Sequence, residues 1–218
     1  MKKGKKDVAI IDYQLGNLFS VKQACNFTGI SAIVTSNKED ILAADALILP
    51  GVGAFIQAMA NLKKLDLCET IKQKVHEGTP IFGICLGLQL LFTKSEEFGS
   101  EDGLDLISGT VKKFPNKLKN RDIKVPHIMW NQIYTQNKPW KESPLKDLNN
   151  FDFMYFIHSY YVEPTNSNCI LTTTNYDEIE FCSSVIQNNI FATQFHPEKS
   201  SNKGITIYEN WALMNNLI

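Results

Sequence analysis

The sequence has 218 residues, of which 44% are hydrophobic, and both values suit a single α/β unit with a substantial core. Its 22 basic and 23 acidic side chains give a net charge of −1. This balance argues against a nucleic acid or a membrane surface as the main partner. The five cysteines are widely scattered and form no C-x-x-C pair, which disfavours a disulfide framework or a metal site and predicts a reducing, cytoplasmic location.

The first half of the chain alternates strand and helix patterns. Short apolar runs predict strands, and stretches with helical spacing predict the helices between them. The expected strands are 8–11, 32–35, 46–49 and 81–84, and the expected helices are 18–27, 54–62, 67–76 and 86–92. This alternation predicts a central, mostly parallel sheet flanked by helices, in an α/β fold.

The second half is rich in strand patterns that turn residues separate. Strands are expected at 106–114, 123–127, 153–162, 169–174, 179–186 and 190–195. The segment 112–124 is the most polar and is expected to be an exposed loop. A final helix is expected at about 204–214, with a cap from 200–202. We expect a basic tail over 1–7, without a signal-peptide pattern, and a single domain over 8–218.

The most informative motif is Gly83-Ile84-Cys85-Leu86-Gly87, a G-x-C-x-G turn directly after an apolar run. A strand that turns sharply into a helix exposes one residue at its apex, and the flanking glycines permit the crowded backbone that this turn needs. Cys85 would then lie at a helix N-terminus, which favours a thiolate. The N–H of Leu86 would point towards an oxyanion formed there.

A second motif, Gln194-Phe195-His196-Pro197-Glu198, offers a base and a carboxylate. Residues two apart on an extended segment share a face, so Glu198 can hold the His196 ring. Alone, a cysteine in an apolar run is usually an inert core residue, and a His-Pro-Glu segment is usually a loop. Together, in the order nucleophile, base and acid, they predict acyl transfer by a Cys85–His196–Glu198 triad.

The segment Pro50-Gly51-Val52-Gly53 directly follows the expected strand 46–49, as Cys85 follows 81–84. Ligand crevices lie beyond the carboxyl ends of parallel strands, so these two segments can meet at one edge of the sheet. Taken alone, the segment is most often a plain tight turn.

The three motifs together resemble the signature segments of the class I, triad-type glutamine amidotransferases. Four further segments resemble the glutaminase subunits of imidazole glycerol phosphate synthases, namely 12–17, 126–131, 155–161 and 198–200. The resemblance runs from about Val8 to the C-terminus. It implies a class I glutamine amidotransferase-like fold, glutamine as the substrate, no cofactor, and a heterodimer with a (β/α)₈-barrel cyclase subunit.

The resemblance also implies roles around the triad. Val52 and Gly53 would complete an oxyanion hole with Leu86. The residues that it places around glutamine are Gln89, Glu97, Ser159 and Tyr160. A buried Glu97 would suit the substrate ammonium, although a solvated Glu97 with Glu96 as the ligand is an alternative. His127 and His158 are expected as satisfied core or interface histidines, and His158 is also a candidate for shaping the pocket.

Positions implied to face the synthase subunit are Trp130, Asn131, Tyr155 and Lys199. Aromatic residues beside an active-site mouth anchor interfaces, although Trp130 and Tyr155 could equally be core residues. Lys199 is hard to bury unpaired, and it predicts a salt bridge between subunits.

The activity that the resemblance implies is hydrolysis of glutamine to glutamate and ammonia. The cyclase would use the ammonia to form imidazole glycerol phosphate and aminoimidazole carboxamide ribotide in histidine biosynthesis. The chain departs from the family at Gln14 and Met129, where glycine is typical. Met129 beside Trp130 leaves open another ammonia acceptor, such as an enzyme that makes amino sugars for surface glycans.

Two further alternatives use the same fold. The complete triad argues against a non-catalytic binding or regulatory protein. Segments 126–131 and 155–161 argue against a relative that hydrolyses peptides.

Overall fold

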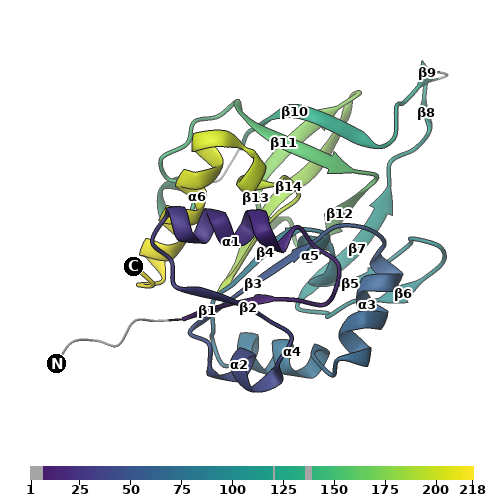
Figure 1. Ribbon diagram of the computed structural model, residues 1–218. Coiled ribbons are helices and arrows are strands. Elements are labelled where there is room, and N and C mark those ends of the chain that lie inside the picture. Colours follow the sequence, from purple (N-terminus) through teal and green to yellow (C-terminus); the bar gives the residue numbers. More distant parts are fainter. Residues whose placement is uncertain (1–6, 120, 136–138) are drawn as a thin grey trace.

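The computed structural model describes residues 7–119, 121–135 and 139–218 (Figure 1). The predicted basic tail therefore lies outside the described residues, apart from Asp7. Five strands form the parallel part of a large sheet, in the order β2-β1-β3-β4-β15. They are β1 (Val8–Ile11), β2 (Ala32–Thr35), β3 (Ala46–Gly51), β4 (Ile81–Cys85) and β15 (Ile190–Thr193). The central, mostly parallel sheet predicted from the sequence is thereby confirmed.

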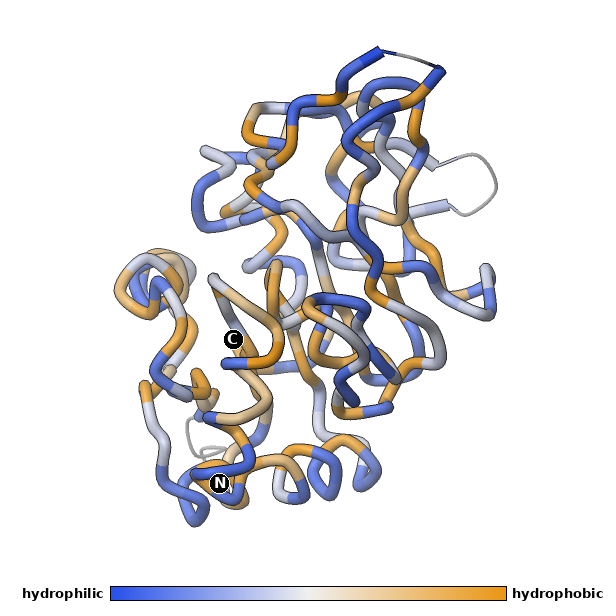
Figure 2. The backbone as a smooth tube through the Cα atoms, turned by 90° about the vertical axis from the view of Figure 1, so that its right-hand side faces the viewer, coloured by the Kyte–Doolittle hydropathy of each residue, from blue (hydrophilic) through white to orange (hydrophobic). Residues whose placement is uncertain are grey.

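Helices cover both faces of the parallel strands (Figure 1). One face carries α1 (Leu18–Phe27) and α6 (Ser201–Met214), and the other carries α2 (Lys38–Ala43), α3 (Phe55–Lys64) and α4 (Cys68–His76). Along β1, Val8 and Ile10 pack on the side of α1 and α6, whereas Ala9 and Ile11 pack with α2 to α4. Because β1, β3, β4 and β15 are buried on both faces, their sequences are continuous apolar runs, while the helices alternate between hydrophobic and hydrophilic residues (Figure 2).

Beyond β15 the sheet continues mainly in antiparallel pairs. Its further strands are β14 (Ile179–Gln187), β12 (Tyr160–Pro164), β7 (Ile107–Lys113), β5 (Phe92–Ser95), β6 (Glu101–Asp102) and β13 (Ile170–Tyr176), which pairs with β14. A separate two-stranded sheet of β10 (His127–Ile133) and β11 (Asp152–His158) stands above it in Figure 1. A small pair consists of β8 (Lys117–Leu118) and β9 (Arg121–Asp122).

Short helical turns complete the chain. They are α5 (Leu86–Leu90) and the 3₁₀ turns η1 (Trp140–Glu142), η2 (Ser167–Cys169) and η3 (Pro197–Lys199). The helix predicted over 86–92 is too long, because Phe92 begins a strand that pairs with β7. The final helix begins at Ser201, and its N-cap residue is Ser200, within the predicted run 200–202. The Ser200 hydroxyl donates to the carbonyl of His196 and makes no capping hydrogen bond to the helix.

The other wrong predictions fall in segments where hydrophobic residues do not recur at a regular spacing. The strand predicted over 123–127 is wrong, because β10 begins only at His127, after Pro126, which has no amide hydrogen to donate to a ladder. The strand predicted over 153–162 is two strands, broken at Ser159. Helix α2 was not predicted, although Asn37 caps it by accepting a hydrogen bond from the Asp40 N–H.

Candidate active site

The predicted nucleophile occupies a strained turn between β4 and α5. Cys85 has φ 54° and ψ −106°, a conformation that residues with a side chain adopt rarely. The turn is also crowded: a Cβ atom on Gly87 would lie 1.7 Å from the carbonyl oxygen of Leu49. A Cβ atom on Gly83 would lie 2.9 Å from the Cβ of Ala192. Both glycines are therefore required by close contacts, as the G-x-C-x-G motif predicted.

The predicted base and acid form a buried pair. Nδ1 of His196 lies 2.7 Å from Oε1 of Glu198, and their side chains are only 2% and 1% exposed. Nε2 of His196 is buried and faces Cys85, so it is placed to exchange a proton with the sulfur. Burial by itself lowers the pKa of His196, but the nearby Cys85 thiolate and then the Glu198 carboxylate raise this pKa to about 10. The ring is thus kept protonated well above the pH at which a free imidazole loses its proton.

Two residues outside the predicted site also lie near the nucleophile, Gln194 in hydrogen-bond contact and Tyr13 within electrostatic reach. Nε2 of Gln194, a completely buried side chain, lies 3.7 Å from the Cys85 sulfur. The hydroxyl of Tyr13 is buried and without a hydrogen-bond partner in the described part of the chain, and a Cβ atom on Gly51 would nearly coincide with it. Burial, and then the charge of Cys85, raise the pKa of Tyr13. Gln194 lies in the His-Pro-Glu segment and Tyr13 in 12–17, so the motifs contained both residues without indicating their contacts.

A cleft of about 310 Å³ opens beside Cys85. This volume is at the small end of the range for ligand sites, which suits a substrate of amino-acid size. All seven residues predicted for the oxyanion hole and the glutamine pocket line it, namely Val52, Gly53, Leu86, Gln89, Glu97, Ser159 and Tyr160. Pro126, Ile157 and His158 complete the wall. The structure thus brings the predicted set together, while the role of each residue stays a prediction.

The loop after β3 lies next to the nucleophile, as predicted from the shared sheet edge. The register of β3 and β4 pairs Gly51 with Cys85. Gly53 has φ +101°, a left-handed conformation that favours glycine. Val52, between the two glycines, is 38% exposed at the mouth of the cleft.

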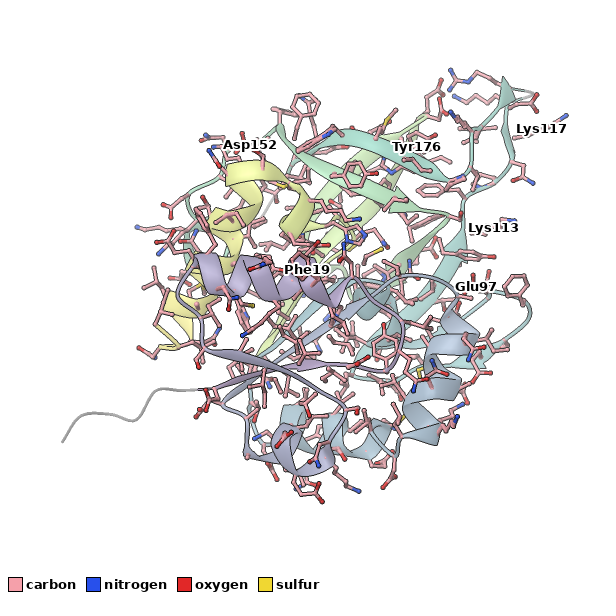
Figure 3. All side chains as sticks on the ribbon, in the orientation of Figure 1. Phe19, Glu97, Lys113, Lys117, Asp152 and Tyr176 are labelled. Carbon is pink, nitrogen blue, oxygen red and sulfur yellow. The ribbon has the colours of Figure 1, made fainter. Side chains whose placement is uncertain are left out.

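Glu97 is the buried member of the Glu96-Glu97 pair and lies beside α3 (Figure 3). Its Oε2 accepts a hydrogen bond from the N–H of Phe55, the first residue of α3. Glu96 is exposed and does not line the cleft. The structure therefore favours Glu97 over Glu96 as a ligand for a substrate cation, and the helix N-terminus helps to keep its carboxylate in place.

Three of the four predicted partner-facing residues form a surface group on β10, β11 and η3, in which Trp130 and Lys199 are exposed and Tyr155 is half-buried. The register pairs Trp130 with Tyr155, and their ring centroids are 6.1 Å apart. Nζ of Lys199 lies 6.0 Å from the centroid of the Tyr155 ring, and no described carboxylate is within salt-bridge distance of it. Asn131 differs, because its amide bonds inward to His127 and to the carbonyl of Asn175.

Two negative findings apply to residues 7–119, 121–135 and 139–218. No group of three or more His, Cys, Asp or Glu side chains there could hold a metal ion. Within the same ranges, no helix has both the length and the apolar content needed to cross a membrane. None of the five cysteines, all of which lie within the described ranges, forms a disulfide.

Comparison with known proteins first identifies the class to which the fold and the site belong. The sequence pattern described as "Glutamine amidotransferase class-I" matches residues 9–214. A solved glutamine amidotransferase superposes with a TM-score of 0.72 at 17% identity, covering 96% of this chain and 98% of the other. The PurLQS structure from Thermotoga maritima gives a TM-score of 0.70 at 16% identity, with the same coverage. These structures share the fold.

The chain belongs to the class I glutamine amidotransferase family. Within this family it is similar to imidazole glycerol phosphate synthase subunit HisH. It is 44% identical over 208 residues to HisH of Geobacter metallireducens, which covers 94% of this chain and 97% of the relative. It is 46% identical over 204 residues to HisH of Aquifex aeolicus, with 93% and 94% covered.

Proposed function

We propose that this chain hydrolyses glutamine to glutamate and ammonia, and delivers the ammonia to the cyclase subunit of an imidazole glycerol phosphate synthase. The observation that carries the proposal is the strained Cys85 beside the buried His196–Glu198 pair, in one cleft with Gln89 and Glu97. The similarity to HisH subunits over nearly the full length supports the particular synthase.

The reaction proceeds through a covalent thioester. The Cys85 thiolate attacks the side-chain carbonyl carbon of glutamine, and His196 gives its proton to the departing ammonia. Neutral His196 then takes a proton from water, whose oxygen attacks the thioester and releases glutamate. Glu198, bonded to Nδ1, keeps the ring in the tautomer that presents Nε2 to these protons.

The tetrahedral intermediates carry an oxyanion that needs hydrogen-bond donors. The N–H of Leu86 follows the nucleophile directly, and a second N–H comes from the loop at Val52 and Gly53. Glycine on both sides of Val52 permits a peptide rotation in this loop. In our proposal the hole is complete only when the partner subunit is engaged, so structures with and without the partner should differ at Val52. An identical loop in both structures would contradict this part of the proposal.

The partner subunit is required by the fate of the product. Free ammonia released into water would be protonated and lost as a nucleophile. A docked acceptor enzyme with a shielded passage avoids this loss, and the surface group of Trp130, Tyr155 and Lys199 offers aromatic anchors and a cation for docking. The proposed partner is a (β/α)₈-barrel cyclase, in a cytoplasmic heterodimer.

The test is glutamate release by the purified chain, with and without the cyclase subunit and its nucleotide substrate. We expect strong stimulation by the pair and its loss in Cys85→Ala. Cys25→Ala, which changes another buried cysteine, serves as the matched control and should retain the activity. Stimulated activity that persists in Cys85→Ala would overturn the proposal.

A second candidate function keeps the chemistry and changes the acceptor. Met129 is 45% exposed on β10 beside Trp130, where the family typically has glycine. Gln14 adopts φ 70°, again in place of a typical glycine. Met129 alters a segment proposed to face the partner, which favours a relative that supplies ammonia to another enzyme, such as one that makes amino sugars. Cys85-dependent activity that does not respond to the cyclase would support this candidate.

A further inference from the structure

Two buried histidines connect the exposed β10–β11 sheet to the wall of the cleft. His127 begins β10 and His158 ends β11, and the register pairs them. Nδ1 of His127 lies 3.0 Å from Nε2 of His158. Neither residue takes part in the proposed chemistry, and His127 does not line the cleft. Their side chains are only 0% and 6% exposed, so their polar nitrogens must find hydrogen-bond partners within the protein and not in solvent.

The hydrogen bonds of this pair have only one consistent direction. The carbonyl oxygen of Tyr160 can only accept, so Nδ1 of His158, 2.8 Å away, carries the proton. In a neutral His158 ring, Nε2 is then an acceptor, and His127 must donate from Nδ1. Nε2 of His127 accepts in turn from the Asn131 amide at 3.3 Å. The second amide hydrogen of Asn131 goes to the carbonyl of Asn175 at 2.9 Å.

The surroundings keep both rings neutral, as this direction requires. Burial lowers the pKa of His127 to about 4. Burial, and then the neighbouring His127, lower the pKa of His158 to about 3. Aromatic rings enclose the pair: Tyr176, labelled in Figure 3, lies 4.1 Å from the His127 ring, and Phe114 lies 5.4 Å from the His158 ring.

On the other side, the same chain of bonds reaches the nucleophile. The Tyr160 carbonyl accepts a second hydrogen bond, from Nε2 of Gln89 at 3.0 Å. That amide also donates to Oε1 of Gln194 at 3.2 Å, and Nε2 of Gln194 donates to the Cys85 sulfur at 3.7 Å. An unbroken chain of hydrogen bonds therefore runs from Asn131 on β10 to the Cys85 sulfur, and in each bond a donor faces an acceptor.

We propose that His127 and His158 are positioning residues for the glutaminase site, which hold the Tyr160 carbonyl, and through it Gln89 and Gln194, in register with Cys85. The inference rests on the proposed function. His158 bridges the break at Ser159, where the chain leaves the β10–β11 sheet and enters the main sheet as β12. A displacement of β10 is thereby passed to the wall that faces glutamine.

The first test uses isosteric variants. In His158→Asn, the amide nitrogen replaces Nδ1 as a donor to the Tyr160 carbonyl, whereas His158→Leu has nearly the same volume and no donor. We expect His158→Leu to raise the KM for glutamine roughly 10-fold, because a buried acceptor is left with one donor fewer, and His158→Asn to restore most of the loss. His127→Leu and His127→Asn should behave in the same way, with a smaller difference.

A merely structural role would lower activity in proportion to thermal stability in both variants of a pair. Equal KM values in the Asn and Leu variants would therefore overturn the proposal. A glutamine analogue with an electrophilic side chain, which alkylates the triad cysteine, separates this outcome from failure of the proposed function. If the unchanged chain is not alkylated at Cys85, the glutaminase itself is absent. If it is alkylated, the rates in the variants test the positioning role.

The second test measures the direction of the hydrogen bonds made by His127 and His158. The ¹⁵N chemical shifts of the imidazole rings report which nitrogen carries the proton, and the chain has only four histidines to assign. We expect both His127 and His158 with the proton on Nδ1. A His158 ring protonated on Nε2 would break the chain of donors and would overturn the proposal.

Discussion

The turn at Cys85 and the β10–β11 sheet are built on opposite principles. Around the turn, the backbone of Leu49 leaves no room for a side chain on Gly87, and the side chains of Ala192 and Leu91 leave none on Gly83, while the neighbouring strands are buried on both faces. The β10–β11 sheet instead has large apolar side chains exposed to solvent, including Ile128, Trp130 and Phe153 at 49%, 46% and 53%. At the turn, close packing holds the Cys85 backbone in one conformation. On the β10–β11 sheet, the exposed apolar side chains form a surface that a partner can cover.

The comparison suggests where substitutions can change function without destroying it. A strained nucleophile persists only where its surroundings determine the backbone, so changes at the turn act on catalysis and stability together. Changes on the exposed sheet act on the choice of partner. The hydrogen-bonded chain through His127 and His158 is the physical connection between the two regions.

The largest expected effect comes from removing the nucleophile. Without the Cys85 sulfur no thioester can form, so Cys85→Ala should lower the kcat of glutaminase by roughly 10⁴-fold or more. The measurement is glutamate release with partner present, and thermal unfolding should show an intact fold. A residual activity above about one hundredth of the original would show that the thiol is not the nucleophile.

The next effect concerns the buried acid. Glu198→Gln keeps the shape but removes the charge that raises the pKa of His196, so kcat should fall by roughly 10³-fold. The pKa of His196 should also fall, and because His196 must be protonated to release ammonia, the alkaline limb of the pH–rate profile should move to lower pH. An unchanged alkaline limb would contradict the assigned role of Glu198.

The same shift has a consequence for stability. The folded-state pKa of His196, about 10, lies above the ordinary value of 6.5. Its contribution to stability is therefore fully present below about pH 6.5 and is lost as the pH rises towards 10. In Glu198→Gln the loss should still begin near pH 6.5, but it should be smaller and complete at a lower pH, as measured by urea unfolding across the pH range.

A smaller effect tests the crowding at the turn. Gly87→Ala places a Cβ atom against the Leu49 carbonyl, and we expect a loss of about 2–3 kcal/mol in unfolding free energy. Gly16→Ala is the matched control, because its nearest contact would be an ordinary 3.4 Å to a Leu18 side-chain atom. Equal stability of the two variants in denaturant titrations would contradict the steric interpretation.

The smallest effect on the stability of the free chain is expected from a substitution on the exposed face of the β10–β11 sheet. Trp130→Ala should weaken binding of the synthase subunit by about 1–2 kcal/mol while leaving the thermal midpoint of the free chain nearly unchanged. Leu213→Ala, on α6, changes a side chain of the same 46% exposure and should leave the affinity unchanged. Calorimetric titration of the two subunits measures both. An equal loss in the two variants would exclude Trp130 as a specific anchor.

The sequence by itself determined the local features of this protein. Continuous apolar runs identified the parallel strands, because a strand buried on both faces needs apolar side chains throughout. The spacing of Gly83, Cys85 and Gly87 identified the turn, because only glycine tolerates such close backbone contacts. The order of the motifs placed Val52 and Cys85 at one edge of the sheet, and their common cleft confirms this placement.

Only the tertiary structure decided which distant residues meet. It chose Glu97 over Glu96, turned Asn131 inward, and brought Gln194 to the Cys85 sulfur across 109 positions of sequence. It also broke the predicted strand 153–162 at Ser159, where the chain passes from one sheet to another. Periodicity reports how one element is buried, whereas these contacts depend on strand order and register, which are set by the packing of the whole chain.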